Sequence, residues 1–501
     1  MRGRIFTYRQ VIFSIFCFLA FTGNSKDLNP SFNKVFLQGE VTVIELFMDE
    51  NDKQLLIKPV DLYADIYYPV DFHFSNSKLD TTVYNVGIRL RGNTARGSKK
   101  KPFKIDFKEY GGEKFLNLKK LNLKPNTNDP SQLREYLTTL MYRKMDVPVA
   151  RAGYTEVYIN DEYMGVYLNV ENIDDEFVDR RYDNEDGNLY KCVYGSTLQL
   201  SNDPYDNKMF ELKTNEDIND RSELENFIKL INDKNISNWS EEINAIFDVD
   251  NYLRQLAVEA MTGHWDGYTY NINNYYLYEN PETGKIVYIP YDMDNTWGID
   301  WVGKDWAKRD LLDWSSDANN TPLTNRILDV KEYKDKYIRY LYEVLGFFKD
   351  HQYFDSIASS HYSLLSGSID NDLYYLMSFN FKHSDFYASW EEAAGGHVKY
   401  GIAEYIDTRT TYAEMQLPEI TANNVIEVKS FQVFPNPCNG ESINISSDNG
   451  EIEDISIFNS LGVRVEFNLE GNNKLTFKNN LRRGIYIIRC GAKTGKFIVS
   501  E

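Results

Sequence analysis

Cysteine and histidine are scarce in this sequence, with four and six residues respectively among 501. Cys17 lies in an apolar stretch near the N-terminus, which leaves Cys192, Cys438 and Cys490 for the rest of the chain. Three thiols make no disulfide framework, and no CxxC or Cys/His spacing indicates a zinc site. One pairing stays open, because Cys438 and Cys490 lie near the two ends of the last segment and would form a bridge in an oxidising compartment.

Positive charge is also scarce: 55 lysines and arginines oppose 75 aspartates and glutamates, for a formal net charge of −20. Nucleic acid requires a basic surface, and so does docking on an anionic membrane face, so the composition argues against both partners. A nucleotide pocket is still possible, since it needs only a few local cations and a divalent metal. With 42% hydrophobic and 15% aromatic residues, the chain can bury a substantial core.

Long apolar runs are absent except near the N-terminus. Residues 11–22 form an apolar stretch that is too short to span a bilayer. Arg2, Arg4 and Arg9 precede this stretch, and small residues follow it. The order is typical of a secretory signal peptide, which we place at residues 1–25. The mature chain is therefore predicted to be exported and to have no transmembrane segment.

The character of the sequence changes after residues 416–430, which we interpret as a linker. Residues 431–501 contain short alternating segments separated by Gly and Asn turns, as expected of a small all-β sandwich. Three pieces of this tail resemble, in order, the type A C-terminal sorting domain of the type IX secretion system: VFPNPCNG (433–440), ISIFNSLGVRV (455–465) and LRRGIYIIRCGAKTGKFIVS (481–500).

The resemblance of the tail implies a route of export. The signal peptide would deliver the chain to the periplasm, and the type IX secretion machinery would then carry it across the outer membrane. The protein would be secreted or held on the cell surface. The alternative is an adhesive β-domain that has no sorting role.

The large segment, residues 35–415, begins with strand patterns and becomes helical. Leu133, Leu137, Leu140 and Met141 recur on one face of its first expected helix. The expected elements are, in order, two strands around the basic loop RGNTARGSKKK (91–101), a helix with Asp129 as N-cap and Pro130 as first residue, a hairpin at 155–172 with its turn at Asn160 and Asp161, helices near 221–233 and 247–262, and a hairpin at 274–292.

The stretch HWDGYTYN, residues 264–271, lies between the last of these helices and the last hairpin. Its H-x-D-x-x-x-x-N spacing is that of the protein-kinase catalytic loop, in which the Asp accepts a hydroxyl proton and the Asn holds a metal. Asp292 follows the apolar strand KIVYIP, a position that presents a carboxylate to Mg²⁺, which prefers hard oxygen ligands. The lysine cluster, helix, hairpin, loop and aspartate follow the serial order of parts in a protein kinase.

Three longer motifs make the comparison more specific. They resemble the spore coat protein CotH kinase family, in the order of that family: IRLRGNTARGSKKKPFKIDF (88–107), YMGVYLNVENID (163–174) and HWDGYTYNINNYYLYENPETGKIVYIPYDMDNTWG (264–298). The resemblance implies an α+β fold in which an atypical protein kinase-like bilobal domain precedes the small β-sandwich. It also implies transfer of the γ-phosphate of ATP to a Ser or Thr of a protein substrate, with Mg²⁺ or Mn²⁺ as cofactor.

The same resemblance assigns roles to individual residues. Asp266 is the expected catalytic residue, His264 supports its loop, and the expected metal ligands are Asp292, Asn271 and Asp294. The expected ATP-binding residues are Lys101, with Lys104 as second choice, Arg91 in a phosphate-facing turn, and Glu171 at a possible hinge. On the first helix, Glu135 is a candidate partner for the lysine, and Arg134 beside it is an equal candidate for a functional role.

The sequence departs from ordinary protein kinases, because it has no GxGxxG loop and has DMD where D-F-G is expected. Two other classes of function therefore stay open. One is a catalytically inactive surface or adhesion protein on a kinase-like scaffold. The other is a D-x-D phosphatase or glycosyltransferase, since the apolar strand before Asp292 is followed by D-x-D-x-T. That class requires a parallel α/β sheet around the motif.

Overall fold

A computed structural model describes residues 27–315, 321–418, 431–447, 455–459, 464–471, 473–478, 480–490 and 493–500. The predicted signal peptide and most of the predicted linker lie outside these residues. The chain divides into two compact units, residues 1–417 and 418–501, and each is described by itself. Within the described ranges, no helix is both long enough and apolar enough to cross a membrane.

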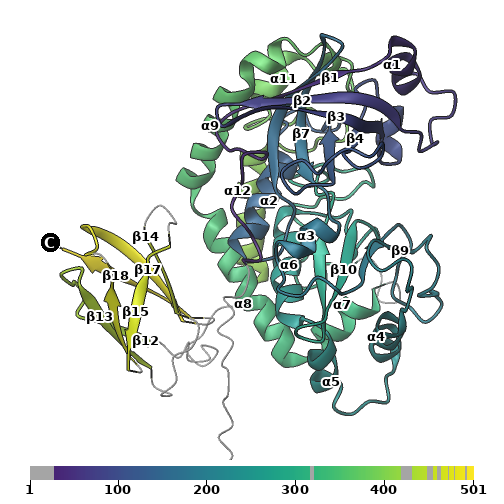
Figure 1. The fold of residues 1–501 in the computed structure, drawn as a ribbon. Coiled ribbons are helices and arrows are strands. Elements are labelled where there is room, and N and C mark those ends of the chain that lie inside the picture. The colour runs from purple at the N-terminus through teal and green to yellow at the C-terminus, as the bar shows by residue number, and fades with distance from the viewer. Residues whose placement is uncertain are drawn as a thin grey trace, which may run out of the picture. The chain divides into compact units, whose positions relative to one another are not determined.

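The larger unit begins with a closed seven-stranded barrel in the order β1-β2-β3-β4-β5-β7-β6 (Figure 1). The pairing of β1 with β6 is parallel, and the other pairings are antiparallel. Side chains alternate between the barrel interior and the outside, which is why Phe72 and Phe74 are both buried. The strands are β1 (Thr42–Phe47), β2 (Tyr68–Asn76), β3 (Leu79–Leu90), β4 (Phe103–Asp106), β5 (Lys120–Lys124), β6 (Ala152–Ile159) and β7 (Glu162–Glu171).

Helix α2 (Arg134–Lys144) follows the barrel strand β5. The prediction that Asp129 caps this helix was wrong, because Leu133 is the N-cap residue. The Asp129 carboxylate instead accepts hydrogen bonds from the backbone N–H groups of Ser131 and Arg134, at 2.9 Å each, so it orders the turn that precedes the helix. The predicted apolar face is confirmed in part: Leu133, Leu137 and Met141 are buried, and Leu140 is half-buried.

Both predicted hairpins are present. The first pairs β6 with β7, and its turn residues Asn160 and Asp161 have positive φ angles of 48° and 62°, as a two-residue hairpin turn requires. The second pairs β10 (Tyr275–Asn280) with β11 (Lys285–Pro290). These two strands join β8 (Leu189–Cys192) and β9 (Phe210–Leu212) in the order β11-β10-β8-β9. All three pairings in this sheet are antiparallel, so the strand before Asp292 lies in no parallel α/β sheet.

Helices surround both sheets of the larger unit (Figure 1). Helix α6 (Val249–Thr262), predicted near 247–262, is buried on nearly all sides and packs against α8, β11 and α2. Helix α9 contacts the barrel strand β7. Besides α2 and α6, the helices are α1 (Glu50–Ile57), α3 (Asp175–Asp179), α4 (Ser222–Asn232), α5 (Trp239–Ile246), α7 (Pro322–Asp329), α8 (Lys331–Phe348), α9 (His351–Asp370), α10 (Leu373–Leu376), α11 (His383–Ala388), α12 (Ile402–Gln416) and the 3₁₀ turn Thr94–Gly97.

The smaller unit contains two antiparallel sheets, β12-β13-β16-β15 and β14-β17-β18, which share one apolar core. Cys438 is buried in that core as a free thiol, so it forms no bridge with Cys490. The helices and strands of the larger unit and the small β-sheets of the smaller unit confirm the predicted α+β class. The strands are β12 (Phe431–Phe434), β13 (Ser442–Ser447), β14 (Ile455–Asn459), β15 (Phe467–Glu470), β16 (Lys474–Phe477), β17 (Gly484–Cys490) and β18 (Lys493–Val499).

A chain that ends at Leu417 should fold, because the three apolar cores of the larger unit contain no residue beyond that position. Its thermal unfolding should match the corresponding transition of the full chain. In the native host, the shortened chain should accumulate in the periplasm, because the tail that resembles a sorting domain has been removed. Delivery of the shortened chain to the medium or cell surface at the level of the full chain would contradict an export role for the tail.

Candidate active site

A cleft of about 730 Å³ opens between the barrel and the four-stranded sheet of the larger unit. Its walls come from segments that are far apart in the sequence, including β3, β4 and β5 on one side and β8, β9 and β10 on the other. Asp266 and Asp292 both line this cleft. The fold therefore brings the loop HWDGYTYN and the DMD motif to the same space.

Lys124, the last residue of β5, is the centre of charge in this region. Its ammonium group contacts the carboxylate of Glu135 on α2 and the carboxylate of Asp292 after β11. The side chains of Lys124 and Glu135 are 7% and 3% exposed, so the contact is shielded from water. The choice between Glu135 and Arg134 is thereby decided by geometry, because Glu135 is the residue that pairs with the lysine.

Lys124 was missed by the sequence analysis, which looked for the lysine in the cluster 99–104. The available signal was its position: Lys124 ends the last strand before the helix that carries Glu135. In a protein kinase, the lysine strand precedes the helix that supplies the paired glutamate, so the order of elements pointed to β5. The richer lysine cluster on the preceding loop concealed that signal.

The carboxylates around Lys124 outnumber it. Burial raises the pKa of Asp294 well above its ordinary value, and the nearby charges of Asp292, Glu135 and Asp266 raise it further. Burial alone would also raise the pKa of Asp292, but Lys124 and Arg91 outweigh that effect and lower it. The result is an ionised Asp292 in a group where two cations, Lys124 and Arg91, face three carboxyl groups, Asp292, Asp294 and Glu135. An additional cation would be favoured at this place.

The side chains present fit a magnesium ion that is completed by phosphate oxygens. In the described part of the chain, no three His, Cys, Asp or Glu side chains are grouped as a ready-made metal site. Mg²⁺ does not require such a group, because it usually binds one or two carboxylates together with waters and substrate phosphates. Asp292, whose side chain is 31% exposed, and Asn271 are the residues that would hold it, with Asp294 nearby.

Amide groups surround the carboxylate of Asp266. Asn271 donates to one of its oxygens at 2.5 Å, while Asn274 and Asn295 donate to the other at 3.0 and 3.1 Å. The bond from Asn271 uses its Nδ2, which leaves the amide Oδ1 for a metal. These neutral donors fix the carboxylate without adding a counter-charge.

Burial shifts the pKa values of Asp266 and His264 in opposite directions. Burial, reinforced by the charge of Asp292, raises the pKa of Asp266 to about 6. Burial lowers the pKa of His264 to about 4, so the imidazole is neutral near pH 7. His264 is buried, and its supporting role stays a prediction, while Asp266 is the residue of this loop that lines the cleft.

Two of the four predicted ATP-binding residues line the cleft. The Arg91 guanidinium donates to the Tyr291 hydroxyl, and Lys104 projects from β4. Among the described residues, Lys104 has no ion-pair partner, and burial together with neighbouring cations lowers its pKa well below the ordinary value. Lys101, the preferred choice, lies outside the cleft lining and donates to the Arg96 carbonyl at 2.7 Å.

Glu171, the fourth predicted residue, lies outside the cleft lining and is fully buried among three arginines. Its carboxylate contacts Arg151 at 2.7 Å, Arg181 at 2.8 Å and Arg180 at 3.2 Å. Although burial alone would raise it, Arg181 and Arg151 hold the pKa of Glu171 well below its ordinary value. The contacts assign Glu171 to the framework between β7 and the segment that follows it, and we withdraw it from the ATP-binding set.

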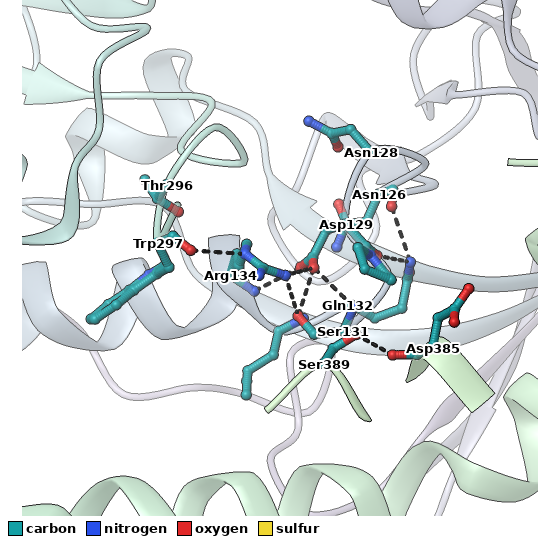
Figure 2. Close-up of polar contacts among 12 residues, drawn as sticks. Asn126, Asn128, Asp129, Ser131, Gln132, Arg134, Thr296, Trp297, Asp385 and Ser389 are labelled. Carbon is teal, nitrogen blue, oxygen red and sulfur yellow. Dashed lines mark hydrogen bonds and ion pairs between the residues drawn. The ribbon is translucent and has the colours of Figure 1, made fainter. Parts of the chain in front are cut away.

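Arg134 has a structural task beside Glu135. Its buried guanidinium pairs with Asp129 and donates to the Ser131 hydroxyl at 3.2 Å, to the Trp297 carbonyl at 3.3 Å and to the Tyr400 carbonyl at 2.9 Å. Figure 2 shows this group of contacts, with Trp297 approaching from the loop that carries the DMD motif. Arg134 thus connects the start of α2 to that loop and fixes the position of one relative to the other.

Comparison with known proteins gives two family matches. A family model described as CotH kinase protein matches residues 88–413, and one described as secretion system C-terminal sorting domain matches residues 432–500. Inner spore coat protein H of Bacillus subtilis is 29% identical over 314 residues, which cover 62% of this chain and 82% of that protein.

Fungal proteins from Rhizopus delemar are also similar. Invasin CotH7 is 29% identical over 208 residues, which cover 39% of this chain and 32% of that protein. Spore coat protein homolog 1 is 27% identical over 245 residues, 46% of this chain and 39% of that protein. The chain thus spans most of the bacterial relative but less than half the length of these two fungal ones.

Replacement of Glu171 by glutamine should destabilise the larger unit without acting on the cleft. Loss of the carboxylate removes an ion-pair partner from three arginines, so the free energy of unfolding near pH 7 should fall by about 3 kcal/mol, as for other broken buried ion pairs. Because pairing lowers the pKa of Glu171 in the folded state, its contribution is present above the unfolded value of 4.5 and is lost as the pH falls below it.

The difference in urea unfolding between wild type and Glu171→Gln should therefore shrink between about pH 7 and about pH 3. Glu113→Gln, on an exposed loop, is the matched control and should unfold like wild type. A Glu171→Gln variant of unchanged stability would show that the arginine cluster does not depend on this carboxylate.

Proposed function

This chain belongs to the CotH kinase family, and we propose that it transfers the γ-phosphate of ATP to Ser or Thr hydroxyl groups of a protein substrate. The observation that carries the proposal is the contact of Lys124 with both Glu135 and Asp292, because Asp292 lines the same cleft as Asp266. On this reading, the barrel and the helical part with the second sheet correspond to the two lobes of a kinase, and the cleft between them holds the nucleotide.

Positive charge supports the proposal that this region binds the phosphates of ATP. Phosphoryl transfer asks a protein mainly to position groups and to stabilise negative charge. Lys124, Arg91 and Lys104 supply positive charge from three adjacent barrel segments, in a chain whose overall charge is −20. The half-buried Lys104, which has no ion-pair partner among the described residues, is the group that gains most from an arriving anion, because partial burial and neighbouring cations disfavour its charged form.

Mg²⁺ or Mn²⁺, when bound, would neutralise charge on the β- and γ-phosphates. Asp292 and Asn271 are the proposed ligands, and Asp294 is the proposed ligand for a second ion. Lys124 contacts one oxygen of Asp292, so the other oxygen would be the one to hold a metal. Arg91 remains beside Asp292 and favours its ionised form.

Asp266 is the proposed base for the acceptor hydroxyl. Its carboxylate is fixed by the three amide donors, and it accepts the hydroxyl proton as the acceptor oxygen attacks phosphorus. The raised pKa of Asp266 brings its basicity closer to neutral pH than that of an exposed aspartate. His264 is neutral and buried, so the proton is better placed on Asp266.

Residues 432–500 form a secretion-system sorting domain, so the protein is exported to the cell surface or beyond. We propose the type IX machinery as the partner in that export. A second candidate function is a catalytically inactive surface protein, and the name of the similar Invasin CotH7 fits a role at the cell surface. The D-x-D phosphatase and glycosyltransferase readings lose their support, since the sheet before Asp292 is antiparallel.

The lysine assignment can be tested by a matched pair of variants. Lys124→Met keeps most of the stem and removes the charge that Glu135 and Asp292 share, so transfer of labelled phosphate from ATP should fall at least ~100-fold. Lys101→Met should keep wild-type activity, because the Lys101 ammonium donates to the Arg96 carbonyl on the loop before β4. Thermal unfolding of both variants checks that each is folded. Full activity in a folded Lys124→Met variant would remove the central contact from the mechanism.

A second pair separates binding from transfer. Asp266→Asn removes the charge that accepts a proton, so transfer should fall at least ~100-fold while ATP and Mg²⁺ still protect the protein against thermal unfolding. Asp292→Ala should lose both transfer and metal-dependent protection, because Asp292 is the main proposed ligand. Protection without transfer in the wild-type protein itself would favour the inactive surface protein. Normal transfer by Asp266→Asn would assign the base to another residue.

A further inference from the structure

An exposed aromatic surface lies beside the loop that carries the DMD motif. It consists of the exposed rings of Trp301 and Phe379 and the buried ring of His397 that both contact, and we refer to these three as the aromatic platform. The Trp301 and His397 rings are stacked, with centroids 4.0 Å apart and planes 10° apart, and the Phe379 ring lies 5.4 Å from the first and 4.6 Å from the second. Trp301 is 48% exposed and Phe379 is 52% exposed.

The platform is held in place by the backbone around it. The buried carboxylate of Asp300 accepts hydrogen bonds from the backbone N–H groups of residues 302, 303 and 304 and from the Trp306 indole, which fixes the loop that presents Trp301. Phe379 has a positive φ angle of 49°, which is unusual for a bulky residue. Two large apolar side chains are thus kept at the surface by ordered segments.

Hydrogen bonds connect the platform to the proposed base. The Trp301 indole Nε1 donates to Asn295 Oδ1 at 3.2 Å, and Asn295 Nδ2 donates to the Asp266 carboxylate at 3.1 Å. Asn128 adds a second route, because its amide donates to Asn295 Oδ1 at 3.2 Å and its carbonyl accepts from His397 at 2.7 Å. In Figure 2 the Asn128 side chain points away from the Asp129–Arg134 pair, which agrees with these contacts on its other side.

We propose that the aromatic platform binds the acceptor polypeptide, by packing against an apolar or aromatic side chain close to the Ser or Thr that is phosphorylated. This inference rests on the proposed function. One amide group and two hydrogen bonds separate the indole from the Asp266 carboxylate, and an extended chain covers such a span in about three residues. The occupant of the platform is therefore a neighbour of the acceptor residue in the same chain.

The chemistry of the surface favours a peptide over a glycan. The indole N–H and the imidazole N–H both donate inside the protein, so the platform offers no ring donor to sugar hydroxyl groups. Its free area is apolar, and Val302 beside Trp301 is also 45% exposed. Rigid exposed aromatic side chains lose little conformational entropy on binding, which is why they often contribute most of the affinity at protein interfaces.

The test uses the full-length protein, ATP, Mg²⁺ and a library of Ser- and Thr-centred peptides in which each flanking position is varied. The wild-type protein should select an apolar or aromatic residue about three positions from the acceptor. Phe379→Ala should raise the KM for the selected peptide at least ~10-fold, with kcat and the KM for ATP nearly unchanged. Val302→Asp, on the same surface, should weaken the same selection, and Tyr84→Ala, an exposed aromatic on β3, should keep it.

The outcomes distinguish the two proposals. The platform proposal would be overturned if the wild-type protein transferred phosphate with no preference for an apolar neighbour. It would also be overturned if Phe379→Ala and Val302→Asp both kept the wild-type preference. In either case the proposed kinase function would still stand. Binding of a glycan array that depends on Phe379, without peptide selection, would overturn it in the same way. Absence of transfer to every peptide and of autophosphorylation would overturn the kinase function, and the platform proposal would fall with it.

Discussion

The ammonium of Lys124 is shared by the carboxylates of Glu135 and Asp292, and the candidate site is arranged around that contact. Lys124 ends the barrel strand β5, Glu135 lies in the first turn of α2, and Asp292 follows β11 of the second sheet. A buried charge must have a partner, since loss of hydration disfavours its ionised form. Each of the three residues supplies that partner for another, so the barrel, the helix and the second sheet meet at the point where the cleft concentrates charge.

The two sides of the cleft use different physical means to fix their carboxylates. On the Asp292 side, Lys124 and Arg91 lower the pKa, so the aspartate is ionised and suited to a metal. On the Asp266 side, the partners are neutral amides, which orient the carboxylate and leave burial to raise its pKa. One fold thereby contains two aspartates of unlike basicity that face the same space, an arrangement that suits one acid as a ligand and the other as a base.

The sequence predicted the parts of the site that depend on local order. The hairpin turn at Asn160 and Asp161, the strand before Asp292 and the loop containing Asp266 were all placed correctly. Turn chemistry and apolar alternation act over a few residues, so they can be read from a short stretch. The choice of Lys101 over Lys124 and the assignment of Glu171 to ATP depended on which side chains reach the cleft. The twist and closure of the barrel decide that, and no short stretch encodes it.

By itself, the sequence determined the family, the C-terminal sorting domain, the α+β class and the order of the chemical motifs, because each is recorded in residue types at fixed spacing. Only the tertiary structure decided how charges are paired. Glu171 pairs with three arginines, Lys124 pairs with Glu135 and Asp292, and Lys104 has no ion-pair partner among the described residues. The physical reason is that electrostatic pairing depends on distances of a few ångströms, which spacing along the chain does not give. Lys124 and Asp292, for example, are 168 positions apart and meet only after the barrel and the second sheet have packed together.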